Sequence, residues 1–200
     1  MTVIDCVRTG ASYGSPGHRY ELVTNTWIVG DETEVVVIDP ANDPEPILAA
    51  VGGRRVRSVL CTNGTVDHVN AAPQVAAPAG APVYLHPADG RFWRGTHPDR
   101  AFDRELVDGL VIEVPGGELE VLHTPGYTRG SCSFRLGGHG VVFVGDTLGA
   151  ELPKAGASPF SDAEAQIASI RTRLLVLPPE TSVRPGHGDA TSIGDHLDQA

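Results

Sequence analysis

The sequence predicts an α/β domain, with a mixed β-sheet and helices packed outside it. Three observations lead to this prediction. Residues 20–40 contain two β-branched, apolar runs joined by a polar turn, as in a hairpin. Further on, strand-like runs alternate with segments of helical character, and polar residues gather where the strands end. Because 200 residues can bury a sizeable core and the composition does not shift along the chain, we expect a single domain over residues 1–200.

The expected elements follow one another from the hairpin to the last strand. The hairpin turns at GDET, and DPEPILAAVGG then predicts a short helix that ends at glycine. A strand is expected at residues 56–62, followed by a helix-compatible segment that ends at Gly80 and by a strand at 81–86. The connection 87–109 is rich in turns and has some helical character. Later strands are expected at residues 110–115, 117–124, 131–137, 140–146 and 181–186.

The clearest helix is predicted from Ser161 onward, over the segment SDAEAQIASIRTRLLVL. Ser161 and Glu164 have the spacing of a capping box, which marks the start of a helix. Apolar residues then recur at helical spacing and predict one stripe that packs on the core rather than a cofactor site. The residues of this stripe are Ala163, Ile167, Ile170, Leu174 and Leu177.

The composition argues against several classes of partner. The chain has 15 Lys and Arg against 25 Asp and Glu, a formal net charge of −10, so we expect no nucleic-acid partner, because such binding relies on neutralising phosphates. No stretch approaches the ~18 apolar residues of a membrane span, and the first residues lack a secretion signal, so we expect no membrane partner and a cytoplasmic location. Cys6, Cys61 and Cys132 are an odd number at wide spacing, which favours reduced thiols.

Potential metal ligands follow directly after four of the apolar strands. Asp67 and His68 come after VRSVLCT, His123 after LEVL, Asp146 after VVFVG and His187 after TSVRPG. Each residue alone could be a helix cap or a turn residue. Together, two carboxylates and three imidazoles at one edge of a sheet would be costly to hold unless a cation offset their repulsion and desolvation. The pattern therefore indicates a divalent metal.

These residues, in this order, resemble the metallo-β-lactamase superfamily. Its five motifs run as an early Asp, a T-H-x-H-x-D-H loop, a His, an Asp in G-D-T and a final His. The corresponding segments here are VVVIDP with Asp39, TNGTVDH from Thr62 to His68, HTPGYT with His123, VGDTL with Asp146 and PGHGD with His187. The resemblance covers roughly residues 20–190. It implies a four-layer αββα sandwich with the site at one edge of the two sheets, and the HTPG turn resembles the glyoxalase II-like branch.

The resemblance also implies how the metal ligands divide between two sites. The first site would take Asn63, Thr65 and His123, but the family has histidines at the first two positions. Amide and hydroxyl oxygens replace imidazole poorly on zinc, so we expect no tightly held ion in the first site. The second site is complete in residue type, and we expect it to hold one divalent ion, most favourably Zn²⁺, with Fe²⁺ and Mn²⁺ also suited. Its ligands would be Asp67, His68, Asp146 and His187.

Three functions agree with this pattern. In the first, the protein is a one-metal hydrolase of a small-molecule thioester or ester, linked to a small thiol or a carrier protein. Asp67 or His123 would accept a proton from the attacking water, and Asn63, Thr65 or Tyr127 would donate to the developing oxyanion. In the second, metal is absent or incidental, and His123, Asp67 and Tyr127 act as acid and base in a lyase, cyclisation or rearrangement step of a biosynthetic pathway. In the third, the protein is a non-catalytic binding protein on the same fold.

Two loops are candidates for the border of a substrate pocket. The segment RFWRGTHP, residues 91–98, is expected as a pocket wall or lid, or else as a surface loop pinned by one buried aromatic residue. Residues 149–160 have the Gly and Pro content of a mobile loop, in which Lys154 could meet a substrate carboxylate. The sequence leaves the oligomeric state open.

Overall fold

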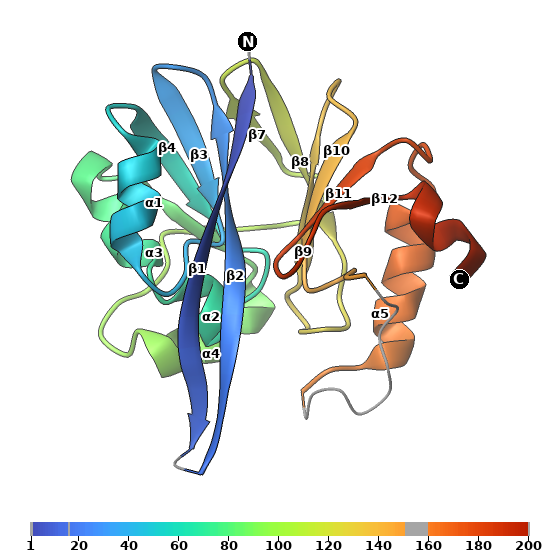
Figure 1. The fold of residues 1–200 in the computed structure, drawn as a ribbon, viewed down its shortest axis with the longest axis horizontal. Coiled ribbons are helices and arrows are strands. Elements are labelled where there is room, and N and C mark those ends of the chain that lie inside the picture. The colour runs from blue at the N-terminus through green and yellow to red at the C-terminus, as the bar shows by residue number, and fades with distance from the viewer. Residues whose placement is uncertain (1, 16, 151–159, 200) are drawn as a thin grey trace.

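The computed structural model describes residues 2–15, 17–150 and 160–199, which form two six-stranded sheets with helices on their outer sides (Figure 1). The first sheet has the spatial order β1 (Val3–Ser15), β2 (His18–Gly30), β3 (Glu34–Ile38), β4 (Arg55–Leu60), β5 (Val83–Leu85) and β6 (Arg104–Glu105). The second has the order β12 (Thr191–Ser192), β11 (Ser182–Pro185), β10 (Val141–Gly145), β9 (Cys132–Leu136), β8 (Gly117–His123) and β7 (Val111–Val114). The predicted four-layer αββα sandwich is confirmed.

Both sheets are mixed. The pairs β1–β2 and β2–β3 are antiparallel, whereas β3, β4, β5 and β6 run parallel to one another; in the second sheet only β10 and β11 pair in parallel. Because β3 and β4 run in parallel, as do β10 and β11, the two strands of each pair have their carboxyl ends at the same edge of the sheet. The loops that follow these ends carry the site residues. The helical segments are α1 (Pro44–Val51), α2 (Val66–Val69), α3 (Ala72–Ala76), η1 (Ala77–Ala79), η2 (Pro87–Asp89), α4 (Gly90–Thr96), α5 (Ala163–Ser169), η3 (Ile170–Leu174) and η4 (Gly194–Gln199).

Three apolar cores separate the four layers. Strand β3 is buried on both faces: Val35 and Val37 point to the core under α1 and α3, while Val36 and Ile38 point to the core between the sheets. The second sheet repeats this pattern, since Phe143 faces the first sheet and Val142 faces η3, directly after α5. This alternation explains why the central strands are continuous apolar runs in the sequence.

The N-terminal strand is an element that the sequence did not reveal. Strand β1 pairs with β2 along its whole length, from Val3 opposite Gly30 to Ser15 opposite His18, and the two strands extend beyond the body of the sheet as a ribbon (Figure 1). Most side chains of β1 are exposed or half-buried, so it lacks the apolar pattern of a core strand. The ribbon matters for function because its second strand borders the cavity described below.

Helix starts differ from the predicted ones at two places. The cap of α5 is Asp162, whose side chain accepts a hydrogen bond from Ala165 N at 3.0 Å, so the predicted capping box at Ser161 was wrong by one residue. The helical segment after β4 begins at Val66 and is interrupted before Ala72, because Pro73 suits the first turn of a new helix.

Within the described residues no helix is long and apolar enough to cross a membrane. Lys154 and most of the predicted mobile loop lie outside the described residues.

Candidate metal centre

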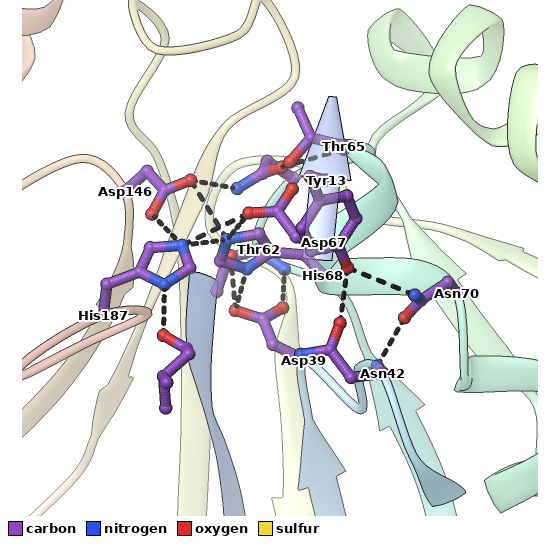
Figure 2. Close-up of polar contacts among 12 residues, drawn as sticks. Tyr13, Asp39, Asn42, Thr62, Thr65, Asp67, His68, Asn70, Asp146 and His187 are labelled. Atoms are coloured by element: carbon purple, nitrogen blue, oxygen red, sulfur yellow. Dashed lines mark hydrogen bonds and ion pairs between the residues drawn. The ribbon is translucent and has the colours of Figure 1, made fainter. Parts of the chain in front are cut away.

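Four predicted ligands from three loops meet at the edge where the two sheets approach each other. Asp67 and His68 lie on α2, directly after β4, whereas Asp146 follows β10 and His187 follows β11. One ligand atom from each residue lies within 4.8 Å of the others, and Figure 2 shows the four side chains pointing toward one another. Asp67 sits inside α2 rather than at its cap, so the alternative of a capping role for Asp67 does not apply.

The two imidazoles approach the carboxylates through the same type of nitrogen. His68 Nε2 lies 3.0 Å from Asp146 Oδ2 and 3.7 Å from Asp67 Oδ2. His187 Nε2 lies 3.3 Å from an oxygen of each of the same two carboxylates, and 3.3 Å from His68 Nε2. Two nitrogen and two carboxylate ligands thus face one small volume.

Outer contacts fix the orientation of both rings. His68 Nδ1 donates to Asp39 Oδ2 at 2.9 Å, and His187 Nδ1 donates to the Val23 carbonyl at 2.7 Å (Figure 2). With a hydrogen on each Nδ1, the Nε2 atoms are left to face the carboxylates. Carboxylate and carbonyl partners behind histidine ligands are the usual second layer of a metal site, because they set the tautomer and the ring angle.

The backbone around Asp39 and Asp146 is shaped to bring these contacts together. Asp39 has a positive φ of 51°, and its carboxylate also accepts from Thr62 N and Thr62 Oγ1, each at 2.7 Å. Gly145 has the same φ of 51°, and a Cβ at this position would lie 2.2 Å from Thr62 Oγ1. Only glycine therefore lets β10 end against the β4 loop, directly before Asp146.

Proximity shifts the pKa values of the acids and bases in opposite directions. Burial alone would lower the pKa of His68, but the carboxylates of Asp146 and Asp39 outweigh it and raise that pKa well above its usual value. Burial alone would raise the pKa values of Asp67 and Asp146, but His187 and His68 respectively outweigh it and lower both. Without a cation, protons on the imidazoles balance the carboxylates, and a bound cation would replace them.

The donor set fits a divalent metal. Two imidazole nitrogens and two carboxylate oxygens are ligands that suit Zn²⁺, Fe²⁺ and Mn²⁺. Asp67 and His68 are buried, and Asp146 and His187 are half-buried. The buried carboxylate of Asp39 adds a third negative charge behind His68. A divalent ion would offset this concentration of negative charge and satisfy the two facing Nε2 atoms.

The residues predicted for a first metal site are not brought together in the same way. Asn63 Oδ1 accepts from Thr65 N at 2.9 Å and from Thr65 Oγ1 at 2.6 Å, so these two side chains bind each other. His123 lies outside the four-residue group: its ring stacks on His86, with centroids 4.3 Å apart, and its Nε2 donates to the Arg129 carbonyl at 3.0 Å. Asn63 Nδ2 still reaches Asp146 Oδ2, at 3.4 Å.

Tyr127 lies beside the group, in the wall of a cavity of about 980 Å³. Asp67, Asp146 and His187 line the same cavity, together with Thr65. Burial is the main cause that raises the pKa of Tyr127 well above its usual range, and the charges of Asp146 and Asp67 add to it. Tyr127 is therefore a neutral phenol that can donate a hydrogen bond into the cavity.

Two residues that support the site were not identified from the sequence. Gln166, on the buried face of α5, donates through Nε2 to the carbonyls of Asp146 and Thr147, at 2.8 and 2.9 Å. Asp89 is fully buried and accepts from Gly64 N, Thr128 Oγ1 and Gly130 N at 2.6–2.9 Å. A polar Gln on an apolar helix face was the one available signal, whereas Asp89 looked like an ordinary turn residue.

Comparison with known proteins agrees with the fold and the centre. Residues 19–187 match the family model described as Metallo-beta-lactamase superfamily, so the chain belongs to the metallo-β-lactamase superfamily, whose members are mainly metal-dependent hydrolases. Within it the chain is similar to the hydroxyacylglutathione hydrolase GloC of Haemophilus influenzae, with 30% identity over 82% of this chain and 84% of the relative. An uncharacterised protein of Mycobacterium tuberculosis is also 30% identical, over 86% of this chain and 89% of the relative.

Solved structures show the same relationship. The crystal structure of TTHA1623 in a di-iron-bound form has a TM-score of 0.77 and 31% identity, over 94% of this chain and 96% of that one. The B3 metallo-β-lactamase BLEG-1 has a TM-score of 0.78 and 25% identity, over 96% of this chain and 97% of that one. The predicted superfamily resemblance, including its glyoxalase II-like relatives, is thus confirmed.

Proposed function

We propose that this protein is a metal-dependent hydrolase of a small-molecule thioester or ester, with a single divalent cation in the second site. The observation that carries the proposal is the group of Asp67, His68, Asp146 and His187, whose ligand atoms lie within 4.8 Å of one another. Outer contacts from Asp39 and Val23 already direct both imidazole Nε2 atoms inward. This fixed orientation of the imidazole rings is expected of a metal site and is not needed for an ordinary surface ion pair.

One cation, rather than two, is the stoichiometry that the residues favour. The similar structure TTHA1623 was solved in a di-iron-bound form. Here Asn63 and Thr65 bind each other, and His123 is engaged with His86 and Arg129. Amide and hydroxyl oxygens are weak ligands for zinc or iron, so the first site lacks the donors for a tightly held second ion. Zn²⁺ suits the second site best, and Fe²⁺ and Mn²⁺ are also suited to it.

The chain's own side chains supply the remaining chemistry. A cation held by the four ligands would polarise the acyl carbonyl and lower the pKa of a water toward ~7. Asp67 lines the cavity, whereas His123 does not and stacks on His86, so we assign Asp67 the role of proton acceptor. We assign Tyr127 the role of donor to the developing oxyanion, because its phenol lines the cavity and stays protonated.

The substrate class follows from the cavity and the relatives. A cavity of about 980 Å³ accommodates a small molecule of the size that ligand pockets commonly hold. Most of its described wall is apolar or aromatic, including Tyr20, Leu22, Phe92 and Phe160. The similar GloC is a hydroxyacylglutathione hydrolase, which makes a thioester of a small thiol the first substrate to test. An acyl group on a carrier protein is the second substrate to test.

Hydrolysis with and without chelation tests the proposal. The purified protein is expected to hydrolyse S-lactoylglutathione or a simple activated ester, to lose this activity after treatment with a chelator, and to regain it with Zn²⁺. Hydrolysis that survives complete metal removal would overturn the metal-dependent function. Conversion of an acyl substrate without hydrolysis in stripped protein would instead support a lyase, cyclisation or rearrangement reaction.

Changing Tyr127 to Phe tests the assigned oxyanion donor. Removing one such donor is expected to lower kcat about 10- to 100-fold, or about 1.4–2.7 kcal/mol of transition-state stabilisation, with KM changed less than about twofold. Tyr84→Phe is the matched control, since Tyr84 packs against the core between the sheets and does not line the cavity. An equal effect of both substitutions on kcat would remove Tyr127 from the mechanism.

A further inference from the structure

The cavity beside the metal centre changes in character along its wall. Where it meets the metal centre, it is lined by the carboxylates of Asp67 and Asp146. Phe160 then forms edge-to-face contacts with Tyr127 and Phe92, with ring centroids 5.6 and 5.1 Å apart. These rings are an apolar surface on which a carbon chain or a ring of a substrate can pack.

Arg91 is a cation on this otherwise apolar and acidic wall. Among the described residues that line the cavity it is the only Lys or Arg. Its guanidinium lies over the ring of Phe92, 4.5 Å from the centroid, and in the described part of the chain it forms no ion pair with Asp67, Asp146 or any other carboxylate. The Arg91 side chain is exposed, and a guanidinium that packs on an aromatic ring and has no ion pair among the described residues is suited to bind an anion.

Packing of α4 explains why Arg91 faces the cavity. Trp93 is buried on the opposite side of the helix, where its Nε1 donates to the Arg100 carbonyl at 2.6 Å and its ring contacts Phe102. This contact fixes the rotation of the helix, so that Arg91 and Phe92, and Gly95 one turn later, line the cavity. Arg94 borders a different surface hollow, beside Trp93.

We propose that Arg91 binds a carboxylate on the substrate, beyond an apolar segment that packs on the aromatic wall. This inference rests on the proposed function, because it names the charge of the ester or thioester substrate that the hydrolase would take. The acyl carbonyl reacts at the metal centre, so a carboxylate farther along the substrate is placed at Arg91, the cation of the described cavity wall outside that centre. A single planar guanidinium matches a carboxylate through two parallel hydrogen bonds.

Paired substrates that differ only in charge test this assignment. On the acyl side we would compare 4-nitrophenyl hydrogen glutarate with 4-nitrophenyl pentanoate, and on the thiol side S-lactoylglutathione with its diethyl ester. The wild type is expected to have a KM about tenfold lower for the anionic member of one pair, as a charge-assisted hydrogen bond provides. Arg91→Ala should remove this preference, and the matched control Arg94→Ala should keep it. Equal preferences in the two variants would overturn the proposal.

A binding measurement decides the inference even if the protein hydrolyses none of these compounds. If none of these compounds is hydrolysed, the proposed hydrolase function is contradicted, but the carboxylate site at Arg91 is not. Isothermal titration calorimetry would then compare 4-phenylbutyrate with the neutral 4-phenylbutanamide on the protein as purified. Tighter binding of the carboxylate by about tenfold, lost in Arg91→Ala and retained in Arg94→Ala, supports the carboxylate site. A preference that persists in Arg91→Ala, or is absent in the wild type, overturns it.

Discussion

Replacing Asp146 with asparagine is expected to lower kcat/KM by about 10³-fold or more, equivalent to about 4 kcal/mol of transition-state stabilisation. Asp146 contacts both imidazoles of the centre, through Oδ2 at 3.0 Å to His68 and Oδ1 at 3.3 Å to His187. The amide has nearly the same shape but carries no charge, so the group keeps its volume and loses one anionic ligand. Steady-state hydrolysis, together with the metal content of the same sample, measures the effect.

The control for this substitution is Asp189→Asn. Asp189 lies two residues after His187, but its side chain is exposed and pairs with Arg8 on the surface. An exposed ion pair contributes little, so hydrolysis should change less than about twofold in this variant. Circular dichroism of Asp146→Asn should match that of the wild type. A folded Asp146→Asn protein that keeps most of its activity and its metal would contradict the assignment of Asp146.

Replacing Asp89 with alanine is expected to lower the free energy of unfolding by about 3–5 kcal/mol. The side chain is fully buried and accepts hydrogen bonds from Gly64 N, Thr128 Oγ1 and Gly130 N. Those three donors belong to the loops that present Thr65 and Tyr127. Alanine would leave the amides of Gly64 and Gly130 without this acceptor, and Thr128 Oγ1 would keep only its contact with Ser131 Oγ. Urea denaturation followed by tryptophan fluorescence measures the change.

Two further variants separate the loss of hydrogen bonds at Asp89 from a general effect of the substitution. Asp89→Asn keeps one acceptor oxygen and should lose less stability than Asp89→Ala. Asp99→Ala removes an exposed carboxylate near the end of α4 and should change stability within about ±0.5 kcal/mol. If Asp89→Ala costs less than about 1 kcal/mol, the buried carboxylate does not hold these loops together.

Much of the fold could be predicted because its central strands have distinctive sequences. Strands β3, β4 and β10 are buried on one or both faces, and their apolar, β-branched runs stand out from the polar loops. Strand β1 could not be predicted in this way, since it forms the edge of the sheet and is largely exposed. Its position depends on its pairing with β2, and such long-range pairing leaves little trace in local sequence.

The metal ligands could be predicted because each follows a recognisable strand. Asp67, Asp146 and His187 all come one to several residues after the carboxyl end of a buried strand, where parallel pairing brings the loops together. The position of His123 could not be predicted by the same reasoning. It also ends a strand, but stacking on His86 and a hydrogen bond to the Arg129 carbonyl hold its ring outside the group.

The supporting contacts depend on tertiary packing alone. Gln166 reaches the carbonyls after β10 only because α5 packs across the second sheet, some 20 residues later in the chain. The pattern of this helical region predicted an apolar stripe, and Ile170 and Leu174, on η3 directly after α5, do lie in the core. Nothing in its spacing indicated that a glutamine on the same helix would hold the loop of Asp146.

The metal content of the protein tests the central claim most directly. Elemental analysis of protein purified without added metal, before and after chelation, should give about one equivalent of a divalent metal per chain, removed together with the hydrolytic activity. His187→Ala should purify with little metal. Two equivalents per chain would contradict the single-ion centre, and a metal-free protein that hydrolyses its substrate at full rate would contradict the metal-dependent function itself.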